Sequence, residues 1–479
     1  MKYLGYLILA FLVYFAIFWN LDYMPIRLWD ESRLAINALE MHENGNFFVT
    51  YFDGLPDMWN TKPPLLIWLQ VMMFNVFGIS VLSFRLPSAI AALFTMIVIL
   101  GFSIRYLKSF WFGFIAICIL LSIDGYIELH SVRTGDYDAL LTLFTTLSGL
   151  LFFVYSETKN NKYLVFFFIF LMFSVFTKGI AGLLFLPGLL FYSLWKKQVL
   201  TILTNKDFYI GVVIFIVPVL GIYLLREAYN HGYLAAVYNN EIGGRYFTEK
   251  NINNDFLYYF KMFTRKRLIP WYVIIPIAIA IGLLNEDSKK KKLTVFLISM
   301  VFPFLAIISF SRTKLSWYDV PAFPFIAMLI AVLLYEIFIK ISKKHWVSIE
   351  VINKVFPLLF ILSIIAIPYL KIIKKNSSPQ DYVYEKRAFD LGVYLQDGLK
   401  GINDLNGFAT VYTGYRPQID FYHRILNKQG VNIRFADWEK LKKGDKVLAI
   451  QKEDKENIER KYKFVKVFTK GDLTVYQIE

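Results

Sequence analysis

The chain of 479 residues is 57% hydrophobic and 18% aromatic, and only 19% of its residues are charged. A soluble domain carries about 25% charged residues, so this composition excludes a soluble enzyme, a disordered chain and a nucleic-acid-binding module. The formal net charge of +15 suits a membrane protein, because the inner loops of such proteins collect Lys and Arg. The single cysteine, Cys118, excludes a disulfide framework and a Cys-based metal site within one chain.

Apolar stretches long enough to cross a bilayer recur along most of the chain. The first runs from about Tyr3 to Trp19, and Asn20 follows it instead of a small-residue cleavage site, so it is predicted to be a retained helix with its N-terminus inside. The later stretches lie near 84–104, 110–129, 139–156, 163–178, 180–195, 208–225, 269–284, 293–310, 319–339 and 347–370. Together they predict an integral membrane α-helical protein with about 11 transmembrane helices.

The stretch Pro63–Gly78 is ambiguous, because its length is at the short end for a span. If it crosses the membrane, every later loop inverts and three lysine clusters, at 196–197, 289–292 and 340–344, lie outside. If it lies along the outer surface, all three clusters lie inside. The positive-inside rule favours the second arrangement, with the C-terminus outside.

From about Asn376 the composition turns polar, and short strand-like runs alternate with helix-like stretches. The sequence therefore predicts a transmembrane domain over 1–375, with a first outer loop over 20–83, and a soluble extracytoplasmic α/β domain over 376–479. The strand-like runs are Phe408–Thr413, Lys446–Ile450, Tyr462–Phe468 and Leu473–Ile478. No internal repeat is evident, so a transporter built from inverted repeats gains no support.

Polar residues gather in three clusters on the predicted outer face. The first follows the first predicted span, begins a short amphipathic helix within the first outer loop, and contains Asp30, Glu31 and Arg33. The second joins the third and fourth spans and contains Arg133, Asp136 and Asp138. The third is spread over several loops and contains Lys62, Glu241, Arg245, Lys314 and Tyr318. Charged groups at a membrane boundary are costly unless paired or hydrated, so these residues are the candidate site.

Each cluster also has a purely structural interpretation. Asp30 can serve as a helix N-cap, and Asp136 or Asp138 can cap the fourth span. Lys178 can extend its ammonium group to the membrane interface. The five histidines are scattered, and none forms a pair with metal-ligand spacing.

Five segments within about the first 340 residues resemble, in order, motifs of the membrane glycosyltransferases of family 39 and family 83 type. These families include protein O-mannosyltransferases and the bacterial aminoarabinose transferase that modifies lipid A. The segments are RLWDESRLAINALEMHENGNF, TKPPLLIWLQVMMFNVFG, RTGDYDALLTLF, VFTKGIAGLLFLP and FSRTKLSWYDVPAFPFIAML. No motif of the C-terminal domain takes part in the resemblance.

The resemblance implies the GT-C fold and a polyprenyl-phosphate sugar as donor. It implies that Asp30 is the catalytic acid of the first outer loop, and that Arg33 and Lys62 face the phosphate. Asp138 matches the second acidic motif, with Asp136 two residues before it and Glu31 beside the first acid. Among the remaining candidates it implies a cationic and an aromatic pocket position, Arg245 and Tyr318.

One departure from the family concerns metal. The aminoarabinose transferases carry a Glu linked to a metal site just before the Lys of the Lys-Pro motif, and this chain has Thr61 there. We therefore expect no tightly bound zinc and no required cofactor, although carboxylate oxygens can still hold a hard divalent cation.

A polyprenyl phosphate is a good leaving group that needs neutralisation by Arg and Lys rather than a proton. One carboxylate then suffices as general base for the acceptor, and direct displacement inverts the anomeric carbon. The partners expected are the lipid-linked donor, a lipid or protein acceptor and membrane lipids, in a bacterial-type plasma membrane. The alternatives are a polyprenyl-phosphate flippase or carrier without catalysis, and a membrane-anchored scaffold for the C-terminal domain.

The topology generates the first prediction. A cysteine introduced by Lys290→Cys should resist a membrane-impermeant maleimide in intact cells and react after permeabilisation, whereas Gly78→Cys should react in both. Labelling of the cysteine at position 290 in intact cells would contradict the predicted orientation.

Overall fold

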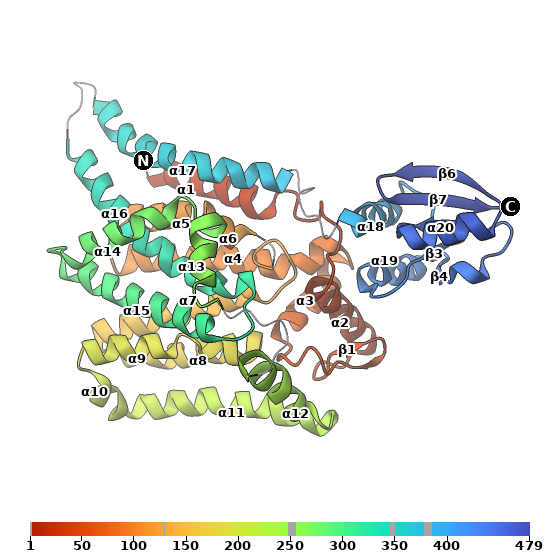
Figure 1. The fold of residues 1–479 in the computed structure, drawn as a ribbon. Coiled ribbons are helices and arrows are strands. Elements are labelled where there is room, and N and C mark those ends of the chain that lie inside the picture. Colours follow the sequence, from red (N-terminus) through yellow and green to blue (C-terminus); the bar gives the residue numbers. More distant parts are fainter. Residues whose placement is uncertain (1, 129, 248–254, 345–349, 378–385) are drawn as a thin grey trace.

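The computed structural model describes residues 2–128, 130–247, 255–344, 350–377 and 386–479. A bundle of long helices forms most of the molecule, and a smaller unit with a β-sheet lies at one end of the bundle (Figure 1). This architecture confirms the predicted membrane-helical fold with a small C-terminal α/β domain.

Among the described residues, seven helical segments are long and apolar enough to cross a membrane. They are α4 (Val81–Arg105), α7 (Asp138–Thr158), α8 (Asn161–Lys178) with η2 (Gly179–Leu183), α11 (Lys206–Tyr229), α15 (Ser288–Phe310), η6 (Ser316–Ala322) with α16 (Phe323–Ser342), and α17 (Glu350–Ser377). A further pair is bent by 117° and consists of α13 (Tyr258–Met262) and η4 (Phe263–Arg267), then η5 (Trp271–Ile274) and α14 (Ile275–Leu283).

Shorter apolar helices account for the remaining predicted spans. They are α1 (Lys2–Val13) with η1 (Tyr14–Phe18), α5 (Phe110–Leu121) and α9 (Leu186–Trp195). Eleven spans result if the bent pair and these three are counted, so the predicted number stays a prediction. The ambiguous stretch forms α3 (Leu65–Phe77), a helix of 13 residues that packs on its neighbours α2 (Asp30–Asn44) and α4.

Polar residues set many of the helix ends. The side chains of Ser80, Ser109, Asn160 and Asp287 each accept a backbone N–H at the start of α4, α5, α8 and α15. Such caps satisfy N–H groups that have no partner within the helix. The other short helices are α6 (Asp124–Ile127), α10 (Val199–Leu203), α12 (Tyr233–Val237) and η3 (Tyr238–Phe247).

Lysines of the predicted inner loops meet at one end of the bundle. Lys196 and Lys292 lie 2.7 and 3.1 Å from the carboxylate of Glu157, at the end of α7. Asp138 begins the same helix, and 21 helical residues span about 30 Å, so the acidic candidates lie at the opposite end. The lysines of the predicted inner loops and the acidic candidates therefore lie at opposite ends of the bundle, as the predicted topology requires. Which end faces the outside of the membrane remains a prediction.

The C-terminal unit contains a five-stranded sheet with strand order β4-β3-β5-β7-β6. The strands are β3 (Phe408–Val411), β4 (Ile433–Ala436), β5 (Lys446–Ala449), β6 (Phe464–Lys470) and β7 (Leu473–Ile478). β3 pairs in parallel with β4 and β5, and β7 pairs antiparallel with β5 and β6. The helices are α18 (Lys386–Leu399), α19 (Pro417–Lys428), η8 (Trp438–Lys440) and α20 (Lys452–Lys461).

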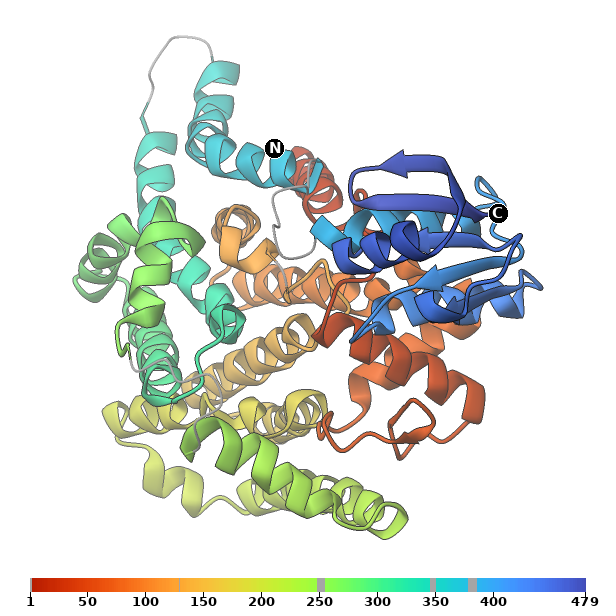
Figure 2. The same ribbon diagram turned by 45° about the vertical axis from the view of Figure 1, so that its right-hand side comes forward.

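Helix α19 attaches this unit to the first outer loop. It packs on α2, beside a hairpin of β1 (Tyr51–Phe52) and β2 (Leu55–Pro56) (Figure 2). The hydroxyl of Tyr422 accepts the buried backbone N–H of Ile26 at 2.9 Å. Arg424 on the same helix donates to Glu40 of α2 at 2.8 Å. The C-terminal unit therefore holds the loop that carries Asp30.

This contact generates the second prediction. Tyr422→Phe leaves the Ile26 N–H buried without its acceptor, so the free energy of unfolding should fall by about 1–3 kcal/mol. Denaturant titration of the detergent-solubilised protein measures the change. Tyr462→Phe is the matched control, because the Tyr462 hydroxyl bonds to Glu439 at an exposed position. Equal losses in the two variants would contradict the assigned role.

Candidate functional site

The two acidic segments meet through Glu31, which is fully buried. One oxygen of its carboxylate accepts from Arg85 at 2.7 Å and from the Gly135 N–H at 2.9 Å. The other oxygen accepts from Arg85 at 2.8 Å and from the Arg27 N–H at 2.9 Å. Because both oxygens are occupied by protein donors, Glu31 joins the segments and is not positioned to exchange protons with a substrate.

Three carboxylates surround His130 at this junction. Its Nδ1 lies 3.1 Å from Asp136 and 4.0 Å from Asp30, and its ring stacks on Trp317 with centroids 3.7 Å apart. The charge of Asp138 also acts on His130. Burial alone would lower the pKa of His130, but the neighbouring Asp136 and Asp30 raise it above its ordinary 6.5. The site therefore contains a protonatable group that sequence inspection did not select.

Asp30 differs from the other two acids in its exposure. Its side chain is 52% accessible, whereas that of Asp136 is 5% accessible and that of Asp138 is 4% accessible. Asp30 is the first residue of α2, and the N-cap position belongs to Trp29, which makes no side-chain cap bond. The simple N-cap interpretation of Asp30 therefore does not describe its position.

Trp29 has a backbone conformation that L side chains rarely adopt, with φ of 63° and ψ of −113°. Its ring stacks on Tyr415 of the C-terminal unit, with centroids 4.9 Å apart and an interplanar angle of 13°. The Tyr415 hydroxyl also donates to the Trp29 carbonyl at 3.3 Å. Such strain persists only where the surroundings hold it, and it is common at functional sites.

Asp138 forms a buried ion pair with Lys178 at the edge of an apolar pocket. The Lys178 ammonium lies 2.6 Å from each oxygen of Asp138 and 5.5 Å from the ring centre of Tyr318. Lys178 is 6% exposed, so it does not reach out to the interface. The pocket is an open hollow of about 580 Å³, space open to solvent included, and its polar lining is Asp138, Lys178, Glu241, Ser311 and Tyr318.

Lys62 joins this pocket through Glu241. The two side chains lie 3.4 Å apart, and the hydroxyl of Thr61 donates to the same Glu241 carboxylate at 3.2 Å. Lys62 also lies 5.5 Å from the ring centre of Tyr137. Thr61 therefore orients the Glu241 carboxylate, which lies beside the Lys62 ammonium.

Arg33 is held by a partner that the sequence did not reveal. Its guanidinium makes two hydrogen bonds, of 2.9 and 2.7 Å, to the two oxygens of Asp57 and lies 4.1 Å from the ring centre of Phe52. Burial would raise the pKa of Asp57, but Arg33 and Asn37 lower it below its usual range. Arg33 therefore fixes the outer loop to α2.

The remaining three candidates are Lys314, Arg133 and Arg245. Lys314 is buried and donates to the Ser311 carbonyl at 2.6 Å. Arg133 donates to backbone carbonyls at the end of the first helix and lines a second pocket. Arg245 falls within η3, but its side chain lies outside the described part of the chain.

Metal ligands do not converge in the described ranges: no group of three or more His, Cys, Asp or Glu residues there has a metal-binding arrangement. Independence from zinc remains a prediction, as does a divalent cation held by carboxylate oxygens.

The chain is similar to known proteins in both sequence and fold. Residues 61–223 match the family model for dolichyl-phosphate-mannose-protein mannosyltransferase. An uncharacterized protein of Aquifex aeolicus is 24% identical over 69% of the chain and 63% of its own length. An undecaprenyl phosphate-alpha-4-amino-4-deoxy-L-arabinose arabinosyl transferase of Aeromonas hydrophila is 24% identical over 65% of the chain and 56% of its own length.

The architecture is similar to the crystal structure of ArnT from Cupriavidus metallidurans bound to undecaprenyl phosphate. The TM-score is 0.64 at 15% identity, over 99% of this chain and 97% of that one. The protein is therefore a multi-pass membrane protein with the GT-C fold. Within that fold it is related in sequence to the glycosyltransferase families that the motifs resemble. The chain spans less than two thirds of the length of the two relatives named above.

The His130–Asp136 pair generates the third prediction. Because the pKa of His130 is raised, the stabilisation from its protonated form is present below pH 6.5 and is lost as the pH rises through the raised value. The melting temperature should therefore fall as the pH increases above neutrality, and His130→Gln should remove this part of the dependence. Melting curves over about pH 6 to 9 measure it.

His231→Gln is the matched control, because His231 is exposed in the loop before α12. An unchanged pH dependence in His130→Gln would remove His130 from this role.

Proposed function

We propose that the protein is a glycosyltransferase that moves a sugar from a polyprenyl-phosphate donor to a lipid or protein acceptor at the outer face of the membrane. The observation that carries the proposal is the exposed carboxylate of Asp30 beside two buried acids, next to a pocket that is apolar except for paired cations and acids. The ArnT structure with bound undecaprenyl phosphate supports the choice of donor class.

The donor's phosphate is assigned to the pocket that contains Lys178 and adjoins Lys62. Both ammonium groups are held by carboxylates in this structure, Lys178 by Asp138 and Lys62 by Glu241. An arriving phosphate would share these cations, since a charge-assisted hydrogen bond to phosphate resembles one to carboxylate. The apolar lining of the pocket suits the first isoprene units of the lipid.

Asp30 is assigned the role of general base. The acceptor's O–H loses its proton to the Asp30 carboxylate while the acceptor oxygen bonds to the anomeric carbon. The bond from that carbon to the phosphate oxygen breaks, and its electron pair stays with the polyprenyl phosphate. A single displacement of this kind inverts the anomeric configuration. Asp136 is held by His130 and Asp138 by Lys178, so both are better placed to orient than to accept the proton.

The assignment of Asp30 generates the fourth prediction. Asp30→Asn should lower the rate of sugar transfer by at least about 100-fold, because the amide cannot take up the acceptor's proton. The variant should still fold and still bind the bare polyprenyl phosphate. The measurement pairs transfer from a labelled lipid donor with a binding assay for the lipid phosphate.

Two further variants serve as a control for the loss of an acid and as a test of lipid-phosphate binding. Asp53→Asn changes an acid of the same outer loop that is exposed and lies 3.6 Å from Arg424, and it should transfer at the normal rate. Lys62→Ala should instead weaken binding of the lipid phosphate. A carrier without catalysis would keep its function in Asp30→Asn, and near-normal sugar transfer in that variant would overturn the assignment of the base.

A further inference from the structure

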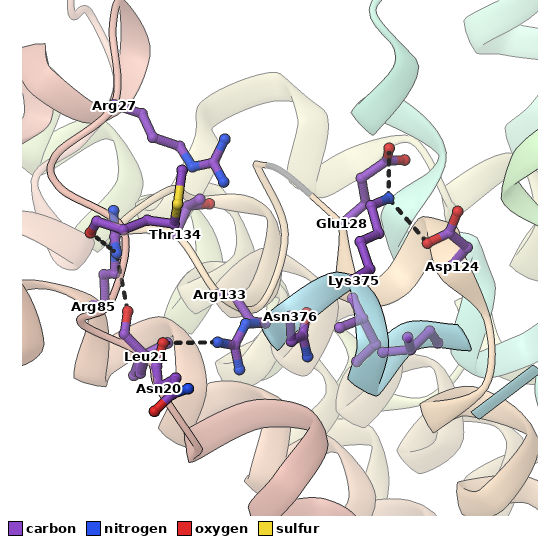
Figure 3. A pocket seen from close by; sticks show the side chains of 13 residues that line it. Asn20, Leu21, Arg27, Arg85, Asp124, Glu128, Arg133, Thr134, Lys375 and Asn376 are labelled. Carbon is purple, nitrogen blue, oxygen red and sulfur yellow. Dashed lines mark hydrogen bonds and ion pairs between the residues drawn. The ribbon is translucent and has the colours of Figure 1, made fainter. Parts of the chain in front are cut away.

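A second pocket lies between the end of the first helix, the end of α17 and the loop before α7 (Figure 3). It is an open hollow of about 560 Å³, space open to solvent included, and it shares no lining residue with the pocket that contains Lys178. We call it the arginine pocket. Its charged lining residues are Arg27, Arg85, Arg133, Lys375, Asp124 and Glu128.

The two sides of the arginine pocket differ in their charge balance. On one side Lys375 lies 3.1 Å from Asp124 and 3.2 Å from Glu128, so cation and acids compensate each other. Arg85 is compensated by Glu31. Arg133, in contrast, makes no ion pair with any residue that the structure describes, and its guanidinium donates only to backbone carbonyls of residues 16, 17, 19 and 20.

Arg133 therefore carries a nearly buried positive charge among other positive charges. Burial, together with the neighbouring charges of Arg85 and Arg27, lowers the pKa of its guanidinium to about 10. A protein usually avoids such a concentration of cations unless an anion shares the space. Four of the five N–H groups of Arg133 donate to those carbonyls, so its charge and its remaining Nε–H are what it offers an anion in the pocket.

The position of the pocket indicates how an anion would reach it. The first helix and α17 lie side by side: the Tyr369 hydroxyl donates to the Leu12 carbonyl and the Asn376 amide donates to the Ala16 carbonyl. Both helices expose large apolar side chains, including Leu7 at 70% and Ile367 at 80%. These faces are suited to lipid, and the arginine pocket lies at the ends of the same two helices.

We propose that the arginine pocket is a binding site for a phosphoryl group, separate from the site of sugar transfer. A phosphoryl group supplies the negative charge that Arg133 lacks, and Arg27 lines the same pocket. The group can arrive on the headgroup of a membrane lipid or as free phosphate, and both share this chemistry. The proposal does not depend on the transferase assignment, because it concerns binding alone.

The test measures the thermal stability of the full-length protein in three settings. These are vesicles of phosphatidylcholine, vesicles containing phosphatidylglycerol, and phosphatidylcholine vesicles with added inorganic phosphate. A phosphoryl ligand that binds the folded state raises the melting temperature with concentration. Arg27→Gln and Arg133→Gln should each weaken the apparent affinity about tenfold, the loss expected for one charge-assisted hydrogen bond.

Lys374→Gln is the matched control, because Lys374 is an exposed cation at the same end of α17 but does not line the pocket. It should leave the affinity unchanged, as should Asp30→Asn. Stabilisation by phosphatidylglycerol alone assigns the site to a lipid headgroup, and stabilisation by inorganic phosphate assigns it to the free anion.

No stabilisation by either form overturns the proposal, and so does an equal loss in Lys374→Gln, which would indicate diffuse attraction to the membrane. Arg27→Gln covers the case in which Arg133→Gln fails to fold, since Arg133 also caps the first helix.

Discussion

The buried pair of Glu31 and Arg85 connects the parts of the molecule on which the proposed chemistry depends. Arg85 comes from α4 and also donates to carbonyls of the loop after the first helix, including that of Leu21 at 2.9 Å. Glu31 comes from α2 and also accepts from Gly135 in the second acidic segment. Removing one partner of such a pair costs about 3–5 kcal/mol, because the other charge is left buried without compensation. Two loops from distant parts of the chain thus share one rigid support.

Much of the helical fold could be predicted, because apolar runs and polar caps give separate signals. The predicted span 208–225 lies within α11, which begins just after Asn205, the residue whose side chain caps it. The predicted span 110–129 is interrupted, since α5 ends at Leu121. Ser122 follows that helix and Asp124 begins the short helix α6, but apolar residues surround both, so hydropathy alone does not separate the two helices. The strand β4 was missed because it lies at the sheet edge and buries only Ile433.

For the candidate site, sequence inspection identified charges but not their partners. Asp30, Asp136 and Asp138 stood out because carboxylates at a membrane boundary require an explanation. Lys178 is 40 residues from Asp138 in the chain, and only the packing of α8 on α7 brings the two together. His130 is one of five scattered histidines, and its role follows from its contacts with Asp136 and Asp30. Partnerships over such separations depend on tertiary structure and leave no local pattern.

The stack of Tyr415 on Trp29 couples the C-terminal domain to the residue before Asp30, and so to the catalysis proposed for Asp30. Coupling between two sites is reciprocal. If contact with α19 favours the ordered conformation of Asp30, a ligand that orders Asp30 must stabilise the contact with α19 by the same free energy. Amide hydrogen exchange in β3 and α19 would then slow when donor or acceptor binds some distance away. On the proposed function, a truncated protein that lacks the sheet would lose sugar transfer because the conformation of the Asp30 loop changes, even if the C-terminal domain never touches a substrate.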